Sequence, residues 1–581
     1  MDSLEVFNWK ICGVGGSGLQ AVSNILGRTL VRGGYSVHVY DEFPSIIKGG
    51  LSTGQVAVSS RTIRSHRTTV QLLVCLTEES IKLHAGELSP NGWLVYDSDV
   101  VSGAPMVRPD VVSFGVPLTS ITREIGAERL LRNTVALGVT LDLLGYPLTD
   151  TKKIIAAEYE GKGHQLVEGN YRALAVGAEY AHAHAPKKFP VALHQLHNPQ
   201  PRMLIPGNDA LSIGALAAGC SLYVAYPMTP SSSILTYLVK HGPDYGMVVR
   251  QLPDEIAVIN QAIGASFAGV RAMVGTSGGG FSLMVEGLGL AAMTETPLVI
   301  INAQRPGPST GLPTWTEQAD LRFVMHASQG DFPRVVLAPG DPNECFTIMP
   351  LAFNIADRYQ TPVIVLTDKY LAESWFTTEP FSLSGVKIDR GQIVKRGKVD
   401  EQTGMYRRYA DAPSGVSPRP LPGTPGLPFM ANSDEHDQFG LSNEEADVRI
   451  TQQNKRLRKI KGIAEELPKP SRYGPKLADL TVICWGSSKG PVLDALDLLA
   501  ADGLTVNAVH VQALSPFPTQ EFRNLVSPAQ RTVVVEGNAA GQFAGLALEQ
   551  TGIELADRIL RFDGRPFEPT ELADAFRQRV K

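Results

Sequence analysis

The chain has 581 residues, 43% of them hydrophobic and 19% charged, and a net charge of −5. This length exceeds what a single hydrophobic core supports and corresponds to three or four domains. The composition is that of a folded globular protein and excludes disorder over most of the chain. A pI near 6.2 without a long lysine or arginine run argues against nucleic acid and anionic membranes as partners.

No apolar run reaches the roughly 18 to 20 residues that span a bilayer, and residues 1–10 lack the layout of a signal peptide. We therefore expect a cytoplasmic protein that does not associate with membranes. The five cysteines lie tens of residues apart, so no CxxC pair is present. We expect neither a zinc site nor an iron–sulfur cluster on this chain.

An α/β domain is expected over residues 1–185. The apolar run Phe7–Cys12 predicts a strand, a helix follows over Leu19–Val31, and Tyr35–Asp41 predicts a second strand. Together they form one βαβ unit of a parallel sheet. The further apolar runs of this domain predict strands at Val70–Leu76 and Trp93–Tyr96 and helices at Gly126–Leu144 and Ala173–His184.

A glycine-rich turn joins the first strand to the first helix. Gly13, Gly15, Gly16 and Gly18 fit the pattern GxGxxG, and Asp41 ends the next strand. Such a turn presents backbone N–H groups and a helix N-terminus to an anion, which favours a phosphate-bearing ligand. A nicotinamide dinucleotide is one candidate, and a tight turn without a ligand is the alternative.

A linker is expected over 186–206, and a second α/β domain over 207–380. Strands alternate with helices throughout this domain, which predicts a doubly wound sheet. The predicted helices are Ala210–Gly219 and Ile234–His241, and the predicted strands are Ser221–Ala225, Met247–Arg250, Ala272–Thr276, Leu298–Asn302, Arg334–Leu337 and Val363–Thr367.

The run from Tyr226 to Ser233 is rich in hydroxyl groups and follows a predicted strand. Pro227 and the next proline fix the backbone on either side of Thr229, which makes Thr229 a rigid donor at the carboxyl end of a strand, where such sheets bind ligands. The serines at 231–233 are expected to cap the helix that follows.

Two acids open the predicted helix after Pro253. Asp254 is expected to cap this helix. Glu255 enters an almost uncharged stretch, so we expect its carboxylate to be partly buried, to need a partner and to have an altered pKa.

Arg305 is the only lysine, arginine or histidine between Arg271 and Arg322. It either binds a carboxylate with its planar guanidinium or pairs with a nearby acid. The glycine-rich turn at 276–281 allows the backbone to approach a ligand closely.

Residues 381–473 break the α/β pattern. Six prolines and three glycines occupy the twenty positions from Asp411 to Met430, which predicts an ordered but irregular excursion. Within it the acidic run Asp434–Asp437 is a poor metal site, and the charged run Asn454–Lys461 is expected to be a solvated or interface face of a helix. A third α/β domain is expected over 474–581.

Several of these motifs together resemble the alpha subunit of 2-oxoacid:ferredoxin oxidoreductases. They are the run Tyr226–Ser232, the helix at Glu255, the run Gln304–Gln318, and Trp485–Gly490. The resemblance covers nearly the whole chain. It implies three α/β domains: a gamma-type domain fused at the N-terminus, a pyrimidine-binding domain for thiamine diphosphate, and a domain like the C-terminal domain of transketolase.

This family converts a 2-oxoacid and CoA to acyl-CoA and CO2 and passes electrons to ferredoxin. The resemblance therefore implies thiamine diphosphate as cofactor, CoA as substrate, and a beta subunit that carries Mg²⁺ and the [4Fe–4S] cluster. The expected assembly is a pair of αβ units. The fused layout is similar to members that act on 2-oxoglutarate, and pyruvate or branched-chain 2-oxoacids are alternatives.

The resemblance also assigns roles to residues. Glu255 matches the glutamate that bonds the aminopyrimidine ring, Thr229 the hydroxyl at the 2-oxo acid group, and Arg305 the arginine that binds the substrate carboxylate. The pattern around Tyr226 and Pro227 belongs to the same cofactor site. The glycine turn and Lys48 match the CoA route.

Two other hypotheses about the function of this chain remain open from the sequence. The glycine turn with Asp41 is compatible with a NAD-linked dehydrogenase. A scaffold whose catalytic sites have decayed is the second, although Thr229, Glu255 and Arg305 are all present.

Overall fold

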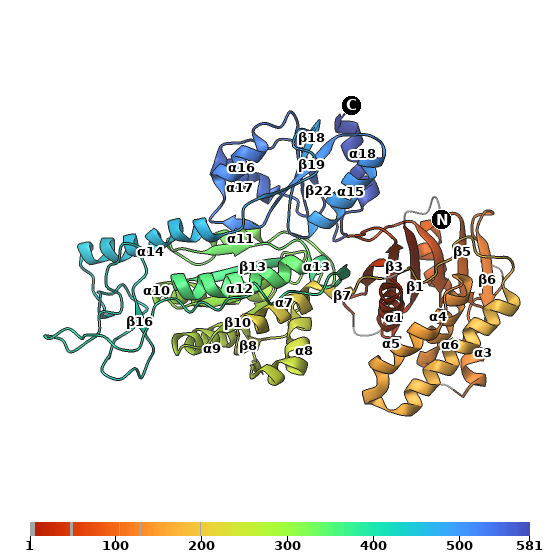
Figure 1. The fold of residues 1–581 in the computed structure, drawn as a ribbon, viewed down its shortest axis with the longest axis horizontal. Helices are drawn as coiled ribbons and strands as arrows, with labels where there is room; N and C mark the ends of the chain where they lie inside the picture. The colour runs from red at the N-terminus through yellow and green to blue at the C-terminus, as the bar shows by residue number, and fades with distance from the viewer. Residues whose placement is uncertain (1–5, 47–49, 104, 127–128, 198, 581) are drawn as a thin grey trace. The chain divides into compact units, whose positions relative to one another are not determined.

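The computed structural model describes residues 6–46, 50–103, 105–126, 129–197 and 199–580. The chain forms two compact units (Figure 1). The first comprises Met1–Ile205, Ser374–Pro380 and Glu568–Thr570, and the second comprises Pro206–Glu373, Phe381–Phe567 and Glu571–Lys581. The domain limits drawn from the sequence remain a prediction.

The first unit is built on an eight-stranded sheet in the order β6-β5-β4-β1-β3-β2-β14-β7. Its strands are β1 (Phe7–Val14), β2 (Ser36–Glu42), β3 (Leu51–Ser59), β4 (Val70–Cys75), β5 (Leu88–Asp97), β6 (Val112–Val116), β7 (Met203–Pro206) and β14 (Trp375–Thr378). Its longer helices are α1 (Leu19–Arg32), α4 (Arg132–Leu143), α5 (Thr149–Tyr159) and α6 (His164–His184). The core packs apolar helix faces against this sheet.

The predicted βαβ unit is wrong in one respect, because a further strand lies between its two strands. The sequence-based account missed β3, which pairs antiparallel with both β1 and β2 and so lies between them. The glycine-rich turn and Asp41 are therefore not on neighbouring strands, as they would be in a dinucleotide-binding fold. β3 was missed because its polar start and small residues do not alternate regularly.

The second unit contains a seven-stranded sheet in the order β20-β12-β13-β11-β10-β8-β9. The strands are β8 (Leu222–Ala225), β9 (Val248–Gln251), β10 (Ala272–Thr276), β11 (Leu298–Gln304), β12 (Val335–Leu337), β13 (Pro362–Asp368) and β20 (Ala513–Ser515). All pairs are parallel except β12 with β20. The main helices of this layer are α7 (Gly207–Ala217), α8 (Ser232–His241), α9 (Glu255–Phe267), α10 (Gly278–Met293) and α12 (Pro342–Tyr359). The predicted doubly wound α/β class is thus confirmed.

A second sheet of this unit, in the order β17-β19-β18-β21-β22, is formed by the C-terminal part of the chain. Its elements are β17 (Ser471–Tyr473), β18 (Leu480–Trp485), β19 (Val506–Val511), β21 (Thr532–Glu536), β22 (Arg558–Leu560), α15 (Lys489–Ala501), α16 (Thr519–Val526), α17 (Gln542–Thr551) and α18 (Pro569–Val580). Gln318 connects the two sheets, because its side chain donates to the Trp485 carbonyl and accepts from the Gly537 N–H. Lys489 also bridges them through ion pairs with Asp341 and Glu344.

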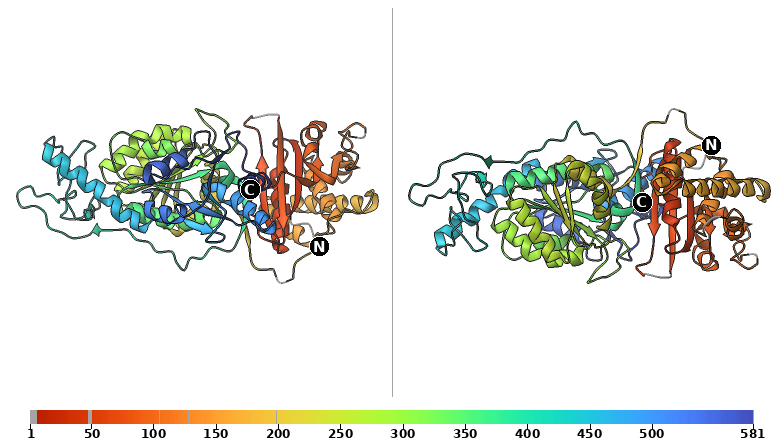
Figure 2. Two further views of the ribbon diagram at one scale, coloured as in Figure 1. Left: turned by 90° about the horizontal axis from the view of Figure 1, so that it is seen from above. Right: turned by 90° about the horizontal axis from the view of Figure 1, so that it is seen from below.

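The excursion is irregular up to Glu445, as predicted, with two-residue strands β15 (Ile393–Val394) and β16 (Arg419–Pro420). It ends in the long helix α14 (Ala446–Glu466), which both views of Figure 2 show beside the loops. Asp357 fixes one part of it to the sheet layer by accepting from Arg390 and Arg419, as well as from Arg271 of the layer itself.

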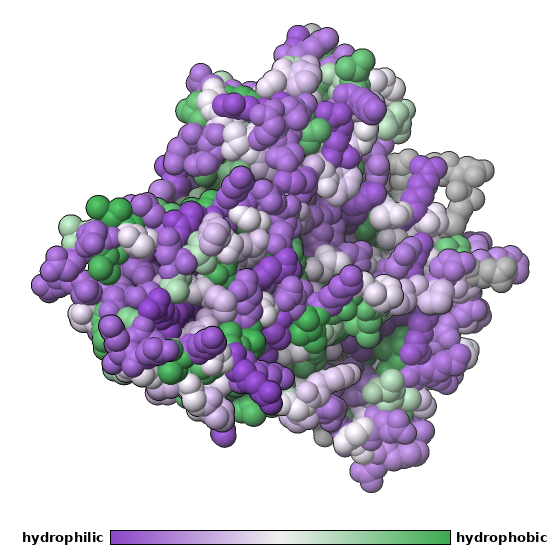
Figure 3. All heavy atoms as spheres, turned by 60° about the vertical axis from the view of Figure 1, so that its left-hand side comes forward, coloured by the Kyte–Doolittle hydropathy of each residue, from purple (hydrophilic) through white to green (hydrophobic). Residues whose placement is uncertain are grey.

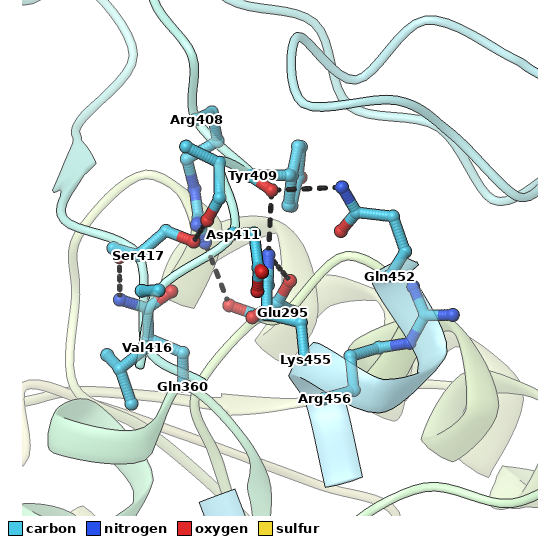
Figure 4. A network of polar contacts seen from close by, with 12 residues as sticks. Glu295, Gln360, Arg408, Tyr409, Asp411, Val416, Ser417, Gln452, Lys455 and Arg456 are labelled. Atoms are coloured by element: carbon cyan, nitrogen blue, oxygen red, sulfur yellow. Dashed lines mark hydrogen bonds and ion pairs between the residues drawn. The ribbon is translucent and has the colours of Figure 1, made fainter. Parts of the chain in front are cut away.

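A buried carboxylate fixes α14. Glu295 is fully buried and pairs with Lys455 at 2.7 Å and with Lys459 at 2.6 Å. Lys455 also donates to the carbonyl of Tyr409 at 3.1 Å. This lysine therefore joins the loop of the excursion that contains Tyr409 to helix α14 (Figure 4). One face of the charged run of α14, with Lys455 and Lys459, is therefore an interface inside the chain, while Asn454, Arg458 and Lys461 are exposed to solvent.

No helix among the described residues is long and apolar enough to cross a membrane. On the face shown in Figure 3, hydrophilic residues predominate and apolar residues gather only in small groups.

Glu295→Gln is expected to lower the free energy of unfolding of the second unit by about 3–5 kcal/mol, because it leaves two buried lysine charges without a counterion. Urea unfolding and faster amide exchange in α14 would measure this loss. Glu78→Gln, which removes the partner of Lys82 in an exposed pair, is the control and should change neither. Slow exchange in α14 of the Glu295 variant would contradict the prediction.

Candidate active site

The carboxyl ends of β8, β10 and β11 meet at one edge of the seven-stranded sheet, since these strands are adjacent and parallel. Thr229 follows β8, the run Ser277–Gly280 follows β10, and Arg305 follows β11. Doubly wound sheets bind their ligands at this edge.

Thr229 and Arg305 are in direct contact. The Arg305 Nη1 group donates to the Thr229 carbonyl at 2.8 Å, and Thr229 precedes Pro230 through a cis peptide bond. The Nε group of Arg305 is buried without a hydrogen-bond partner. Among the described residues no carboxylate lies within 4.0 Å of this guanidinium, so the arginine is fixed at one end and available to an anion at the other.

Glu255 opens helix α9. Asp254 caps this helix as predicted, because its carboxylate accepts from the Ala257 N–H at 2.8 Å. The next side chain then points inward, and Glu255 is only 3% exposed. Its Oε1 atom is buried without a hydrogen-bond partner. An unpaired buried carboxylate oxygen is costly, so this site is built for a group that the chain itself does not supply.

Gly280 provides the space beside this oxygen. A Cβ atom at Gly280 would overlap Oε1 of Glu255 and Oγ1 of Thr276. The Gly280 N–H points to the Met228 sulfur at 3.3 Å, and Met228 precedes Thr229. Glu255 is thereby linked through Gly280 and Met228 to Thr229 and Arg305.

A cavity of about 820 Å³ opens beside this group of residues. Arg305, Asp320 and the first glycines of α10 line it, together with Met228 and Phe323. Because these glycines have no side chains, the backbone at the start of α10 is exposed to the cavity. This agrees with the expectation that a ligand can approach the backbone closely here.

Two acids, Asp320 in the cavity wall and Glu317 three residues before it, were not assigned roles from the sequence. Burial raises the pKa of Asp320 to about 6, against the opposing effects of Asn302 and Arg305. Burial and the neighbouring charges of Asp320 and Asp563 raise the pKa of Glu317 to about 7. The signal that could have indicated Asp320 is that it and Glu317 are the only acids in the 16 residues that follow Arg305.

The other residues of the loop that follows β8 are exposed at the surface or form hydrogen bonds to the backbone. Tyr226 is 38% exposed, and Pro227 beside it is also exposed. The predicted serine cap is wrong: Ser231 has helical backbone angles and its hydroxyl donates back to the Met228 carbonyl. The hydroxyl of Ser233 accepts from Asn208 instead.

The glycine-rich turn belongs to the first unit. Gly16 and Gly18 have positive φ values of 79° and 83°, and a Cβ atom on Gly16 would meet open space. The N–H of Gly15 donates to the Gly50 carbonyl at 3.0 Å, while Gly13 is part of β1. Lys48 lies outside the described residues.

The acidic run at 434–437 holds the excursion together. Glu435 accepts from Arg456, and His436 is buried. Over the parts of the chain that are described, no three His, Cys, Asp or Glu side chains come together in a way that could hold a metal ion.

Three family models match consecutive parts of the chain. The pyruvate flavodoxin/ferredoxin oxidoreductase, thiamine diphosphate-binding model matches 213–456, which includes Thr229, Glu255 and Arg305. The pyruvate ferredoxin/flavodoxin oxidoreductase model matches 8–180, and that of the pyruvate:ferredoxin oxidoreductase core domain II matches 478–572. Fold and site therefore define an oxidoreductase of the pyruvate:ferredoxin type with a thiamine diphosphate-binding domain.

Relatives over the full length narrow this class. The 2-oxoacid:ferredoxin oxidoreductase subunit alpha of Saccharolobus solfataricus is 31% identical over 99% of this chain and 98% of its own. The 2-oxoglutarate oxidoreductase subunit KorA of Mycobacterium tuberculosis is 30% identical over 95% of this chain and 90% of its own. The chain belongs to the 2-oxoacid:ferredoxin oxidoreductase family as an alpha subunit with a fused gamma-type domain.

A solved structure agrees with this assignment. The 2-oxoglutarate:ferredoxin oxidoreductase from Magnetococcus marinus, with 2-oxoglutarate, coenzyme A and succinyl-CoA bound, has a TM-score of 0.91 and 29% identity over 100% of both chains. These findings confirm the predicted class and do not favour the NAD-linked alternative.

Gly280→Ala is expected to lower the affinity of the assembled enzyme for thiamine diphosphate about 10- to 100-fold, because the added methyl group would overlap the carboxylate of Glu255. Activity measured against cofactor concentration would report this. Gly279→Ala is the matched control in the same helical turn, since its nearest neighbour would be 3.8 Å away. Equal affinities of the two variants would contradict the prediction.

Proposed function

We propose that this chain, together with a beta subunit, oxidises 2-oxoglutarate or a related 2-oxoacid with CoA to acyl-CoA and CO2 and passes the electrons to ferredoxin. The observation that carries the proposal is the buried Oε1 of Glu255, which has no hydrogen-bond partner in the same domain in which the buried Nε of Arg305 also has none. Both residues lie in the segment that matches a thiamine diphosphate-binding family model.

The residues around Glu255 fit the pyrimidine half of thiamine diphosphate. The free carboxylate oxygen would accept a hydrogen bond from the protonated ring nitrogen, and the bare turn at Gly280 leaves space for a flat ring. Burial keeps water from competing for this oxygen. When bound, thiamine diphosphate supplies the carbanion that attacks the 2-oxo carbon of the substrate.

Arg305 and Thr229 would orient the 2-oxoacid. Nη1 of Arg305 is held by the Thr229 carbonyl, so the guanidinium keeps one orientation, and its buried Nε is without a partner. A planar guanidinium binds a carboxylate through two parallel hydrogen bonds. The Thr229 hydroxyl would contact the 2-oxo acid group, and Tyr226 and Pro227 would border the cofactor at the open side.

The glycine turn of the first unit would bind CoA. Gly13, Gly15, Gly16 and Gly18 bring the backbone to the N-terminus of the 14-residue helix α1, which favours a phosphate group. Lys48 would add a positive charge on the same route.

The rest of the active centre would come from other subunits. We assign Mg²⁺, the diphosphate contacts and the [4Fe–4S] cluster to a beta subunit, with two αβ units in the assembly and ferredoxin as the electron acceptor. The resemblance of the whole chain to alpha subunits supports this division, and a cytoplasmic location belongs to the same proposal.

Glu255→Gln is expected to lower kcat of the reconstituted complex about 10²- to 10⁴-fold, because a neutral amide cannot hold the ring nitrogen in its protonated form. Steady-state turnover with a dye acceptor measures this. Asp254→Asn, one residue earlier, should stay within about twofold, since asparagine caps helices as well as aspartate does. Full activity of the Glu255 variant would revive the scaffold alternative.

The preferred substrate is expected to be 2-oxoglutarate, with kcat/KM at least about tenfold above that of pyruvate or a branched-chain 2-oxoacid, because the solved structure that matches the whole chain holds 2-oxoglutarate. Turnover of the three acids by the wild-type complex decides this. Equal or better use of pyruvate would refute the 2-oxoglutarate assignment and leave the family assignment intact.

A further inference from the structure

Arg305 shares the cavity beside the site with an acid that the proposed chemistry does not use. Both Arg305 and Asp320 line the cavity of about 820 Å³. They are not an ion pair, since within the described ranges no carboxylate oxygen lies within 4.0 Å of Arg305. Burial lowers the pKa of Arg305, and Asp320 raises it by its charge at a longer distance.

The position of Asp320 is fixed by two contacts to strand β11. Its backbone N–H donates to Oε1 of Gln304 at 2.9 Å, and its Oδ2 accepts from Nδ2 of Asn302 at 3.2 Å. Oδ1 of Asn302 is buried without a partner. The Asn302 amide can go on donating to one oxygen of Asp320 when the other oxygen is protonated, so this contact holds the acid in both protonation states.

The charges that face Asp320 come from two directions. Arg305, at the end of β11, stabilises the ionised acid. Glu317, on the same loop as Asp320, carries a raised pKa through burial first and then through the charges of Asp320 and Asp563. Among the residues that the structure describes, Arg305 is the one whose charge favours ionisation of Asp320.

A substrate carboxylate changes this balance. Bound to Arg305, it brings a second negative charge into a cavity that already desolvates Asp320. Two carboxylates that share one such site do not both remain ionised, and the one with the raised pKa takes up a proton. A neutral carboxylic acid then donates one hydrogen bond where the ionised form only repels.

We propose that Asp320 is a substrate-positioning residue that takes up one proton when a 2-oxoacid binds to Arg305 and donates the resulting O–H to the substrate carboxylate. Arg305 and Asp320 would then bind the same carboxylate, one as a cation and the other as a neutral donor. The proposal rests on the proposed function, because it assumes that Arg305 receives a 2-oxoacid.

The test uses the αβ complex and 2-hydroxyglutarate, which has the carboxylates but no 2-oxo group and therefore does not react. Its competitive Ki is measured from pH 6 to pH 8. For the wild type, Ki should rise up to about 50-fold, because the acid with a pKa of about 6 must first be protonated. For Asp320→Asn, which carries an uncharged donor at every pH, Ki should vary less than about twofold and match the wild type near pH 6.

Glu317→Gln is the matched control, since it removes the neighbouring acid of raised pKa. It should retain the rise of Ki with pH. A flat profile for this variant, together with a steep one for Asp320→Asn, would overturn the proposal and assign the proton to Glu317. A flat wild-type profile would also overturn it.

Calorimetry on the wild type gives an independent measurement that needs no variant to fold. Binding of 2-hydroxyglutarate at pH 8 in two buffers of different ionisation enthalpy should show uptake of about one proton. No uptake would overturn the role of Asp320. Failure of the wild-type complex to turn over any 2-oxoacid would instead refute the proposed function.

Discussion

The site depends on one carboxylate that is kept out of water without a complete set of partners. Asp254 caps helix α9 and so turns Glu255 into the protein, where one of its oxygens is left without a hydrogen bond. Because such a group is costly to bury, the fold must gain that free energy elsewhere. Gly280 leaves room beside this oxygen, and the preceding glycines of α10 line a cavity together with Arg305.

Buried charges of another kind keep the long excursion in place. Glu295 pairs with two lysines of α14, and Asp357 pairs with Arg271 of the sheet layer and Arg419 of the excursion. In contrast to Glu255, these acids form ion pairs within the chain, and they hold a segment that is rich in proline.

The cavity combines two kinds of carboxylate recognition. Arg305 offers a permanent positive charge, whereas Asp320 offers a charge that depends on the ligand and on pH. Because Arg305 and Asp320 line the same cavity, the site can bind an anion without carrying a permanent net positive or negative charge. This arrangement would link substrate binding in the alpha subunit to proton uptake.

The sequence alone indicated the α/β class, most strands of the seven-stranded sheet and the irregular excursion, because these follow from local periodicity and proline content, and the resemblance of its motifs predicted the roles of Thr229, Glu255 and Arg305. Only the tertiary structure decided what depends on distant residues: the insertion of β3 between β1 and β2, the burial of the α14 lysines against Glu295, and the pairing of β20 with β12. The role of Asp320 belongs to the same group, since a raised pKa requires burial, and the burial of a single aspartate cannot be deduced from its neighbours in the sequence.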